Sequence, residues 1–287
     1  MKNLISIVIP TYNREKKLHR AVLSIIEQSF TNWELIIVDN WSDDSSEKLI
    51  NSLGCNKIFF YKINNNGIIA KSRNFGISKS NGNYICFLDS DDWWHKDKLY
   101  FLNRYISKNY DLIFHDMFLT PSTLLKKKTS YCRRLFAPVF EDLLENGPAF
   151  PTSSVCVKKK VIQDCGGFNE NPDFLAWEDY DTWLRISKMT DKFFKIPKSL
   201  GFLTVDNENF LSDEISIKNI FSFKENYYFN KKLPNWALFS LIRSYYRIND
   251  FKNSSLYLNQ LNIIKLNFKL FLRFLLFKLI LSVKNLK

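Results

Sequence analysis

The chain has 287 residues, 46% of them hydrophobic and 24% charged, so it can form one large globular domain or two. Its formal net charge of +12 favours anionic partners, such as nucleic acid, anionic lipid or phosphorylated substrates. Five cysteines without C-x-x-C spacing argue against a disulfide framework and a zinc ribbon, and they fit a reducing compartment. The first apolar run stops at Pro10 without a cleavage pattern, so we expect a strand there and not a signal peptide.

Apolar segments alternate with helical stripes through the first hundred residues. Strands are predicted at Leu4–Ile9, Leu35–Val38, Lys57–Tyr61 and Tyr84–Leu88, and the first, second and fourth read as buried. Helices are predicted between them at Glu15–Gln28, Ser42–Ser52 and Ile68–Ser80. This alternation predicts a parallel, doubly wound α/β sheet.

Each predicted strand ends in a polar cluster. The clusters are Thr11–Asn13, Asp39, Asn64–Gly67 and Asp89–Asp92. Because the carboxyl ends of parallel strands line one crevice, we expect the clusters to meet there. Three carboxylates within four positions repel one another unless a cation compensates them, which favours a divalent metal site. The alternative is a helix N-terminus near Trp93, capped by Asp91 or Asp92.

The next hundred residues are less regular. We expect a helix at Leu99–Tyr110, a strand at Asp111–Phe118, a basic loop at 121–135 and a helix at Phe136–Asn146. The basic loop is better explained as solvated charge than as a phosphate clamp. A Gly-Gly-Phe turn follows at Gly166–Phe168, and acidic residues gather at a predicted helix start, Glu178–Asp181.

Four motifs carry a family resemblance. They are SIVIPTYNR (6–14), ELIIVDNWSDDS (34–45), NNGIIAKSRNFGI (65–77) and YICFLDSDDWW (84–94). In this order and spacing they resemble the nucleotide-binding half of GT-A glycosyltransferases of the large inverting family 2. One departure is Asn40–Trp41, where the family more often has Asp-Gly. The resemblance implies a Rossmann-like GT-A fold with a mostly parallel sheet, followed here by a C-terminal helical extension.

The resemblance also implies donor-binding roles. The implied residues are Pro10, Thr11, Tyr12, Asp39, Arg73, Asp89 and Ser90. Tyr12 would face the nucleobase, Asp39 would accept the imino hydrogen of uracil, and Arg73 would pair with a phosphate or a base carbonyl. The competing explanations are strand-end packing for Tyr12, helix capping for Asp39 and a solvated charge for Arg73. Asp89 would face the donor ribose or sugar, and Asp91 would bind Mn²⁺ or Mg²⁺.

In the second half, the acidic helix start implies the catalytic base. By its place in the motif we assign the base to Asp179, with Glu178 as an acceptor-binding neighbour. Helix capping accounts for one or two of these acids, and Glu178 or Asp181 is the fallback base. The three histidines, His19, His95 and His115, are isolated and better explained as structural.

The last third is helical and basic. Trp236–Gln260 resembles one helical hairpin of the tetratricopeptide kind, which cannot stand alone. Lys265–Lys284 mixes apolar residues with lysine and arginine too often for a membrane span, and suits an interfacial helix on an anionic leaflet. The alternative is a partner-binding or core helix. We expect a glycosyltransferase domain at 1–212, divided at residue 100 into donor and acceptor halves, and a helical region at 213–287.

Together the resemblance implies a metal-dependent, inverting transfer from a UDP-sugar to a sugar hydroxyl. The acceptor would be a lipid-diphosphate-linked glycan in surface polysaccharide assembly of the O-antigen type. The enzyme would be cytoplasmic and peripheral on the inner face of the membrane, contacting it through residues 263–287, without a nucleic-acid partner. Two alternatives are a catalytically silent membrane scaffold and an Asp-x-Asp phosphatase with Asp89 as nucleophile. The phosphatase would need a small hydroxyl residue near Trp93.

Overall fold

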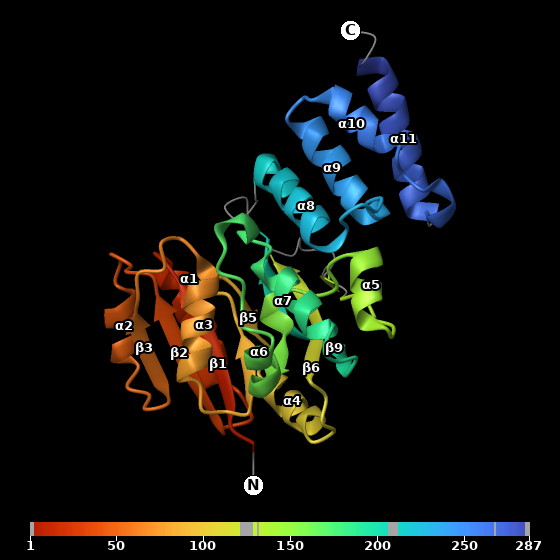
Figure 1. The fold of residues 1–287 in the computed structure, drawn as a ribbon. Coiled ribbons are helices and arrows are strands. Elements are labelled where there is room, and N and C mark those ends of the chain that lie inside the picture. The colour runs from red at the N-terminus through yellow and green to blue at the C-terminus, as the bar shows by residue number, and fades with distance from the viewer. Residues whose placement is uncertain (1–2, 121–128, 131, 206–211, 267, 285–287) are drawn as a thin grey trace.

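The computed structural model describes residues 3–120, 129–130, 132–205, 212–266 and 268–284 (Figure 1). Helices flank one mixed sheet, and a group of four helices lies beyond one end of it (Figure 1). Most of the basic loop predicted at 121–135 falls outside the described residues.

The first half of the sheet is parallel, as the alternation predicts. Its strands lie in the order β3-β2-β1-β4, with bounds β1 Ile5–Thr11, β2 Trp33–Asp39, β3 Ile58–Lys62 and β4 Tyr84–Phe87. Every residue of β1, β2 and β4 is buried, which explains why these strands are mostly apolar. The predicted strands of the first hundred residues are therefore confirmed.

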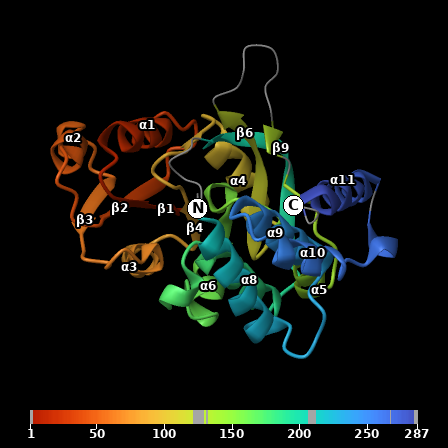
Figure 2. The same cartoon turned by 90° about the horizontal axis from the view of Figure 1, so that it is seen from above.

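Helices cover both faces of this half. Their bounds are α1 Glu15–Ile26, α2 Ser46–Ser52 and α3 Ile69–Lys79. Figure 2 shows α1 and α2 on one side of the strands and α3 on the other. Alternate residues of β1 serve the two faces, since Ile7 packs in the cluster with α1 whereas Val8 packs in the cluster with α3.

The second half of the sheet is mixed. From β4 it continues through β8 (Cys156–Lys158), β6 (Leu112–Thr120), β9 (Phe193–Thr204) and β5 (Trp93–Trp94), with β7 (Thr129–Ser130) paired to β6. The pairs β4–β8, β8–β6 and β9–β5 are antiparallel, and β6–β9 is parallel. The sequence did not predict β5 or β9. Residues 93–94 form a strand, so a helix does not start at Trp93; the next helix, α4 (Lys98–Ile106), begins later.

Further helices complete the molecule. In the sheet-bearing part they are α5 Val139–Asn146, α6 Lys159–Asp164 and α7 Glu178–Ser187, with short 3₁₀ turns η1 Thr152–Ser154 and η2 Pro172–Phe174. The helical group contains α8 Asp213–Tyr227, α9 Asn235–Arg247, α10 Phe251–Leu258 and α11 Phe268–Lys284, with the turn η4 Ile263–Lys265 before α11. The hairpin predicted at Trp236–Gln260 corresponds to α9 and α10.

The helical group is joined to the sheet-bearing part by aromatic packing and hydrogen bonds. The Trp177 and Trp236 rings stack with centroids 5.9 Å apart, and the Trp236 Nε1 donates to the Leu144 carbonyl at 2.8 Å. The Tyr227 hydroxyl donates to Asp181 Oδ1 at 2.6 Å. The helices α8 and α9 therefore pack directly beside the start of α7.

Candidate active site

Two adjoining cavities form one groove at the carboxyl edge of the parallel strands. The larger, about 460 Å³, is lined by both acidic clusters, Asp89–Asp92 and Glu178–Asp179. The smaller, about 250 Å³, is lined by Thr11 and Tyr12. Both cavities share the residues Pro10, Arg14, Gly67, Ile69 and Ser90. The expectation that the polar clusters at the strand ends lie together is thus confirmed for all of them except Asp39.

Arg73 connects the two acidic clusters. From α3 its guanidinium donates to Asp89 Oδ1 at 2.8 Å and to Glu178 Oε1 at 2.5 Å. The residue is buried, and although burial lowers its pKa, the carboxylates of Asp89 and Glu178 raise it above the usual value. The competing explanation of Arg73 as a solvated charge is therefore wrong. Its guanidinium holds two carboxylates across the groove.

The Asp91–Asp92 turn is held from several sides. Arg14 Nη1 donates to Asp91 Oδ2 at 2.7 Å, and Arg20 Nη2 donates to the Asp91 carbonyl at 2.5 Å. The Thr204 amide, at the end of β9, donates to Asp92 Oδ1 at 2.8 Å. Burial, followed by the charge of Asp89, raises the pKa of Asp92 to about 8. The turn thus gathers carboxyl groups whose ionised forms a bound cation would stabilise.

The donor set fits a divalent metal shared with a substrate. In the described residues, no group of three or more His, Cys, Asp or Glu side chains could hold a metal ion alone. Mg²⁺ is commonly bound through one or two carboxylates plus substrate phosphates, and Asp91 and Asp92 both line the larger cavity. These residues therefore suit a metal ion whose remaining ligands come from a diphosphate.

The start of α7 presents two acids to the same cavity. Glu178 is buried, and its Oε2 has no hydrogen-bond partner among the described residues. Asp179 is partly buried; its Oδ2 accepts from the Thr152 hydroxyl at 2.7 Å and its Oδ1 from the Tyr180 amide at 2.6 Å. Burial raises the pKa of both carboxyls, while the charge of Arg73 lowers it. A carboxylate with a raised pKa is a better proton acceptor near neutral pH.

The turn η1 makes hydrogen bonds with both acidic clusters. Thr152 contacts Asp179, and the Ser153 hydroxyl accepts from the Asp89 amide at 3.1 Å. The Ser153 carbonyl in turn accepts from Lys98 Nζ and from Trp94 Nε1, both at 2.9 Å. Lys98 is fully buried, which lowers its pKa to about 7.

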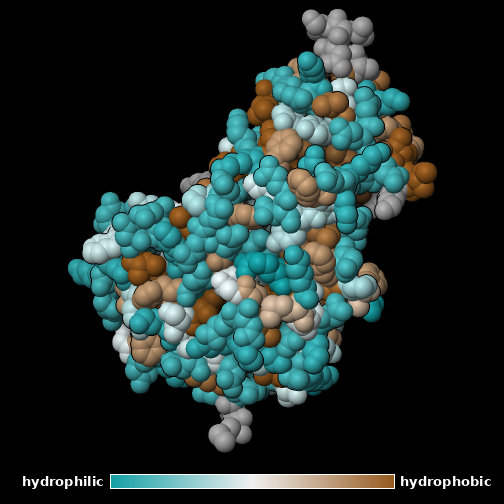
Figure 3. All heavy atoms as spheres, viewed as in Figure 1, coloured by the Kyte–Doolittle hydropathy of each residue, from teal (hydrophilic) through white to brown (hydrophobic). Residues whose placement is uncertain are grey.

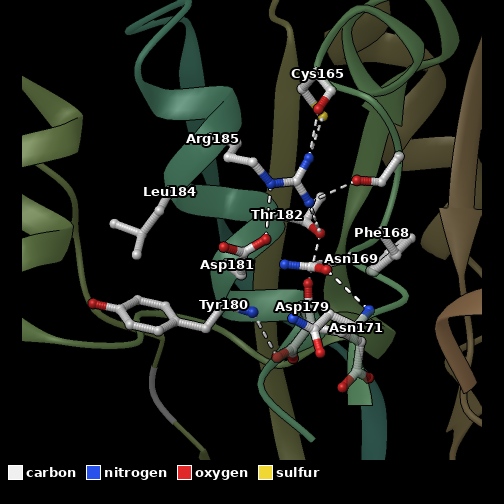
Figure 4. Close-up of polar contacts among 12 residues, drawn as sticks. Cys165, Phe168, Asn169, Asn171, Asp179, Tyr180, Asp181, Thr182, Leu184 and Arg185 are labelled. Atoms are coloured by element: carbon white, nitrogen blue, oxygen red, sulfur yellow. Dashed lines mark hydrogen bonds and ion pairs between the residues drawn. The ribbon is translucent and has the colours of Figure 1, made fainter. Parts of the chain in front are cut away.

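Arg185 fixes the loop behind α7. Figure 4 shows its guanidinium reaching from α7 toward Cys165 and Thr182, with Asp181 beside it. Arg185 Nη2 also donates to the Gly167 carbonyl at 2.7 Å. Gly167 itself has φ +73° and an added Cβ would lie 2.6 Å from Asn74 Oδ1, so glycine is required there. The Gly-Gly-Phe turn therefore has a packing role, and Asp181 is occupied by Arg185 and Tyr227.

The predicted site residues line the groove with one exception, Asp39. Pro10, Thr11, Tyr12, Arg73, Asp89, Ser90, Asp91, Glu178 and Asp179 all line the groove. Tyr12 is 55% exposed, so it is not a packing residue. Asp39 does not line either cavity. It is fully buried; its Oδ2 accepts from the Ser42 amide at 2.9 Å and its Oδ1 from the Ser42 hydroxyl. Asp39 does not cap α2 either, because the N-cap residue of that helix is Ser45.

Sequence reasoning missed several supporting residues. Arg14 lies inside the first motif, but nothing in the sequence shows that it contacts Asp91. Thr152, Ser153 and Thr204 act through contacts that span many positions of the chain, from 27 residues for Thr152–Asp179 to 112 for Thr204–Asp92. Lys98 gave no distinguishing signal either, because Lys96 lies between the same apolar residues, Trp94 and Leu99, and is exposed.

The parallel half-sheet, the acidic turn at its carboxyl edge and the facing acids Glu178 and Asp179 are the arrangement of a GT-A glycosyltransferase fold. Residues 6–163 match the family model for glycosyl transferase family 2. This match covers more than half of the chain, and the chain therefore belongs to glycosyl transferase family 2. The phosphatase alternative is set aside on this evidence.

Two relatives place the chain within the family. It is 40% identical over 116 residues to an uncharacterized glycosyltransferase from Haemophilus influenzae, covering 39% of this chain and 46% of the relative. It is 30% identical over 209 residues to the amylovoran biosynthesis glycosyltransferase AmsB from Erwinia amylovora, covering 68% of each. The chain thus spans about half of the first relative.

Solved structures confirm the fold. Staphylococcus aureus TarS 1–349 in complex with UDP-GlcNAc aligns with TM-score 0.61 and 17% identity, over 89% of this chain and 72% of that one. The mannosyltransferase PcManGT from Pyrobaculum calidifontis, in complex with GDP-Man and Mn²⁺, aligns with TM-score 0.60 and 14% identity, over 91% and 74%. The predicted GT-A α/β fold with a C-terminal helical region is confirmed.

Proposed function

We propose that this protein transfers a sugar from a nucleotide-diphosphate donor, with UDP as the nucleotide, to a hydroxyl of a glycan acceptor. The observation that carries the proposal is the single cavity in which the Asp89–Asp92 turn faces Glu178 and Asp179. Donors of this class are bound in the TarS and PcManGT complexes, which share the fold.

The groove divides into donor and acceptor parts. Thr11 and Tyr12 line the smaller cavity, where Tyr12 offers an exposed ring for the base and Thr11 Oγ1 is buried without a partner in the described residues. Pro10 and Ser90 line the passage to the larger cavity, and Asp89 contacts the donor sugar or ribose. The base-edge role of Asp39 stays a prediction, because its carboxylate is engaged by Ser42 here.

The chemistry is a single displacement with inversion at the anomeric carbon. The acceptor oxygen forms the new bond to that carbon while the bond from carbon to the diphosphate oxygen breaks, and the electron pair leaves with the diphosphate. Asp179 accepts the hydroxyl proton, a contribution of about 10²–10⁴-fold. Glu178 Oε2, a buried acceptor without a partner in the described chain, takes a hydrogen bond from the acceptor glycan.

Asp91, with Asp92 beside it, would hold Mn²⁺ or Mg²⁺, which stabilises the negative charge on the leaving diphosphate when bound. Independently of the metal, Arg73 keeps Asp89 and Glu178 in fixed positions on the two sides of the cavity. Arg14, which lines both cavities, adds a positive charge beside the diphosphate position.

The acceptor is proposed from the relatives. AmsB is named for amylovoran biosynthesis, which supports a role for this chain in assembling a bacterial surface polysaccharide. We propose a lipid-diphosphate-linked glycan as acceptor, at the cytoplasmic face of the membrane. The division into a transferase domain at 1–212 and a helical region from 213 belongs to this proposal.

Metal-dependent nucleotide binding tests the donor site. UDP should raise the melting temperature more in the presence of Mn²⁺, and Asp91→Asn should remove most of that metal-dependent gain while the protein stays folded. Asp164→Asn, which changes a half-exposed acid at the end of α6, is the matched control. A variant at Asp91 that binds UDP with Mn²⁺ as tightly as the parent would show that the metal is held elsewhere.

Turnover tests the base. After a screen of nucleotide sugars, Asp179→Asn should lower kcat by about 100-fold or more with donor affinity unchanged. A comparable loss of donor affinity would place Asp179 in binding instead. Absence of transfer by the parent with every donor and lipid-linked acceptor would favour the silent scaffold.

A further inference from the structure

Most of the net positive charge of this protein belongs to its helical region. Residues 213–287 contain 13 Lys and Arg but only 4 Asp and Glu, a net charge of +9 out of +12 for the whole chain. The sheet-bearing part that holds the candidate active site is therefore nearly balanced. A charge excess confined to one region indicates an anionic partner for that region.

Within this region, α11 has two apolar faces. One face is buried, with Phe274 and Leu281 packed in a cluster with residues of α9 and α10. The other face is exposed, and we call it the α11 stripe. The stripe consists of Phe271, Leu272, Leu275, Leu276 and Leu279, which are 36–65% exposed. A patch of hydrophobic residues is visible on the upper right of Figure 3, where Figure 1 places α11.

The exposed apolar surface extends beyond the helix itself. Ile263 and Ile264 lie in the turn before α11, and Ile264 is 96% exposed. A single exposed leucine is ordinary, but seven large apolar residues along one short segment are not. In the described residues, no helix is long and apolar enough to cross a membrane.

Basic residues border the α11 stripe on both sides. At 100° per residue, Arg273 and Lys278 fall between the exposed stripe and the buried face, one at each edge. Both side chains are exposed. An apolar stripe edged by cations matches the boundary between acyl chains and anionic headgroups.

From this arrangement we infer that the α11 stripe, with Ile263 and Ile264, is a docking surface for an anionic lipid bilayer. The stripe inserts among the acyl chains while Arg273 and Lys278 contact headgroup phosphates. A second copy of the chain is the less favourable occupant, because two regions of net charge +9 would repel each other. The helix lies parallel to the bilayer, since its opposite face stays packed on α9 and α10.

This inference deepens the proposed function by naming where a lipid-linked acceptor is met, yet it is separable from the chemistry. None of the docking residues lines the groove that holds Asp91 and Asp179. Loss of docking should therefore leave nucleotide binding and transfer to a water-soluble acceptor unchanged. Failure of the chemistry would equally leave docking intact.

Vesicle co-sedimentation of the full chain tests the surface. The protein should sediment with vesicles of mixed phosphatidylcholine and phosphatidylglycerol, and much less with phosphatidylcholine alone or at high salt. Leu275→Ser with Leu276→Ser should reduce binding at least tenfold. Arg273→Gln with Lys278→Gln should weaken it about fivefold for each charge removed.

Matched controls separate the surface from general effects. Leu256→Ser changes an exposed leucine on α10, and Lys160→Gln changes an exposed lysine on α6; neither should alter vesicle binding. Circular dichroism confirms that each variant is folded, which is expected because only exposed side chains change. Binding by the double leucine variant equal to that of the parent would overturn the inference. A concentration-dependent dimer that is lost in the same variant would also overturn it, in favour of a second copy.

Discussion

At the scale of single residues, the candidate site depends on side chains that hold other side chains. Arg73 is the clearest case, since it joins the carboxylate of Asp89 to that of Glu178, which lies 105 positions further along the chain than Arg73. The family resemblance singled out Arg73 but implied a phosphate or a base carbonyl as its partner. The partners could not be predicted because Glu178 reaches Arg73 only after the sheet has brought α3 and α7 together.

Thr152 should tune the proposed base. Its hydroxyl donates to Asp179 Oδ2, which lowers a pKa that burial raises. Thr152→Val removes that bond, so the pKa of Asp179 rises and the acidic limb of the kcat/KM profile moves to higher pH. Thr152→Ser keeps the hydroxyl and should keep the profile of the parent. Equal loss of kcat/KM at every pH in the valine variant would mean that Thr152 only maintains local structure.

Lys98 should make stability depend on pH. Its pKa is about 7 in the fold and about 10.4 in an unfolded chain, so between these values the unfolded state binds more protons. Stability therefore rises with pH above 7, by up to about 1.4 kcal/mol per pH unit from this group. The difference in unfolding free energy between the parent and Lys98→Met should show this slope in urea titrations at pH 7 and 8.5.

The matched change at an exposed lysine, Lys160→Met, should show no such slope. A parent and a Lys98→Met variant whose stabilities change in parallel with pH would mean that Lys98 keeps its proton in the fold, held by the Ser153 carbonyl and the Trp94 ring.

At the scale of elements, the sequence predicted what has a local pattern. The strands β1, β2 and β4 are buried on both faces, so their apolar runs identified them. The strands β5 and β9 were missed for two physical reasons. The first has only two residues. The second has no regular alternation of buried and exposed positions, contains Pro197 and pairs with β6 from about eighty residues away. Their pairing places Thr204 beside Asp91 and Asp92.

The packing of α3 on β1 depends on Gly76. A Cβ at this position would lie 2.3 Å from Val8 Cγ1, closer than real contacts allow. Glycine within a helix normally costs about 1 kcal/mol relative to alanine, but Gly76→Ala should here destabilise the protein by about 1–3 kcal/mol. Thermal unfolding measures the change, with Ser78→Ala on the exposed face of α3 as control. A higher melting temperature for Gly76→Ala would show that α3 can move away from β1.

At the scale of the whole molecule, the helical group packs against the part of the protein that holds the candidate site. Phe223 of α8 and Trp236 of α9 pack against Trp177 and Tyr180 at the start of α7. A chain that ends at residue 212 would uncover these rings and leave Asp181 without Tyr227. We expect that shortened chain to aggregate or to melt at a much lower temperature than the full chain, in light scattering and calorimetry.

The full chain carrying Leu275→Ser and Leu276→Ser is the reference for this comparison, because it changes the tail without exposing buried surface. If the chain ending at 212 melts as the full chain does, the aromatic contacts beside α7 contribute little to the stability of the transferase part.

The aromatic contacts between Trp177 and Trp236 also matter for protein engineering. Exchanging C-terminal segments between members of this family is an obvious way to redirect an enzyme to new acceptors. In this protein such an exchange at residue 212 would cut through the packing that supports the Glu178–Asp179 helix start. Chimeras should therefore be joined after α10, so that the sequence taken from the other enzyme replaces only α11 and the proposed bilayer contact. The membrane that the enzyme binds can then change while the Glu178–Asp179 helix start keeps its packing against α8 and α9.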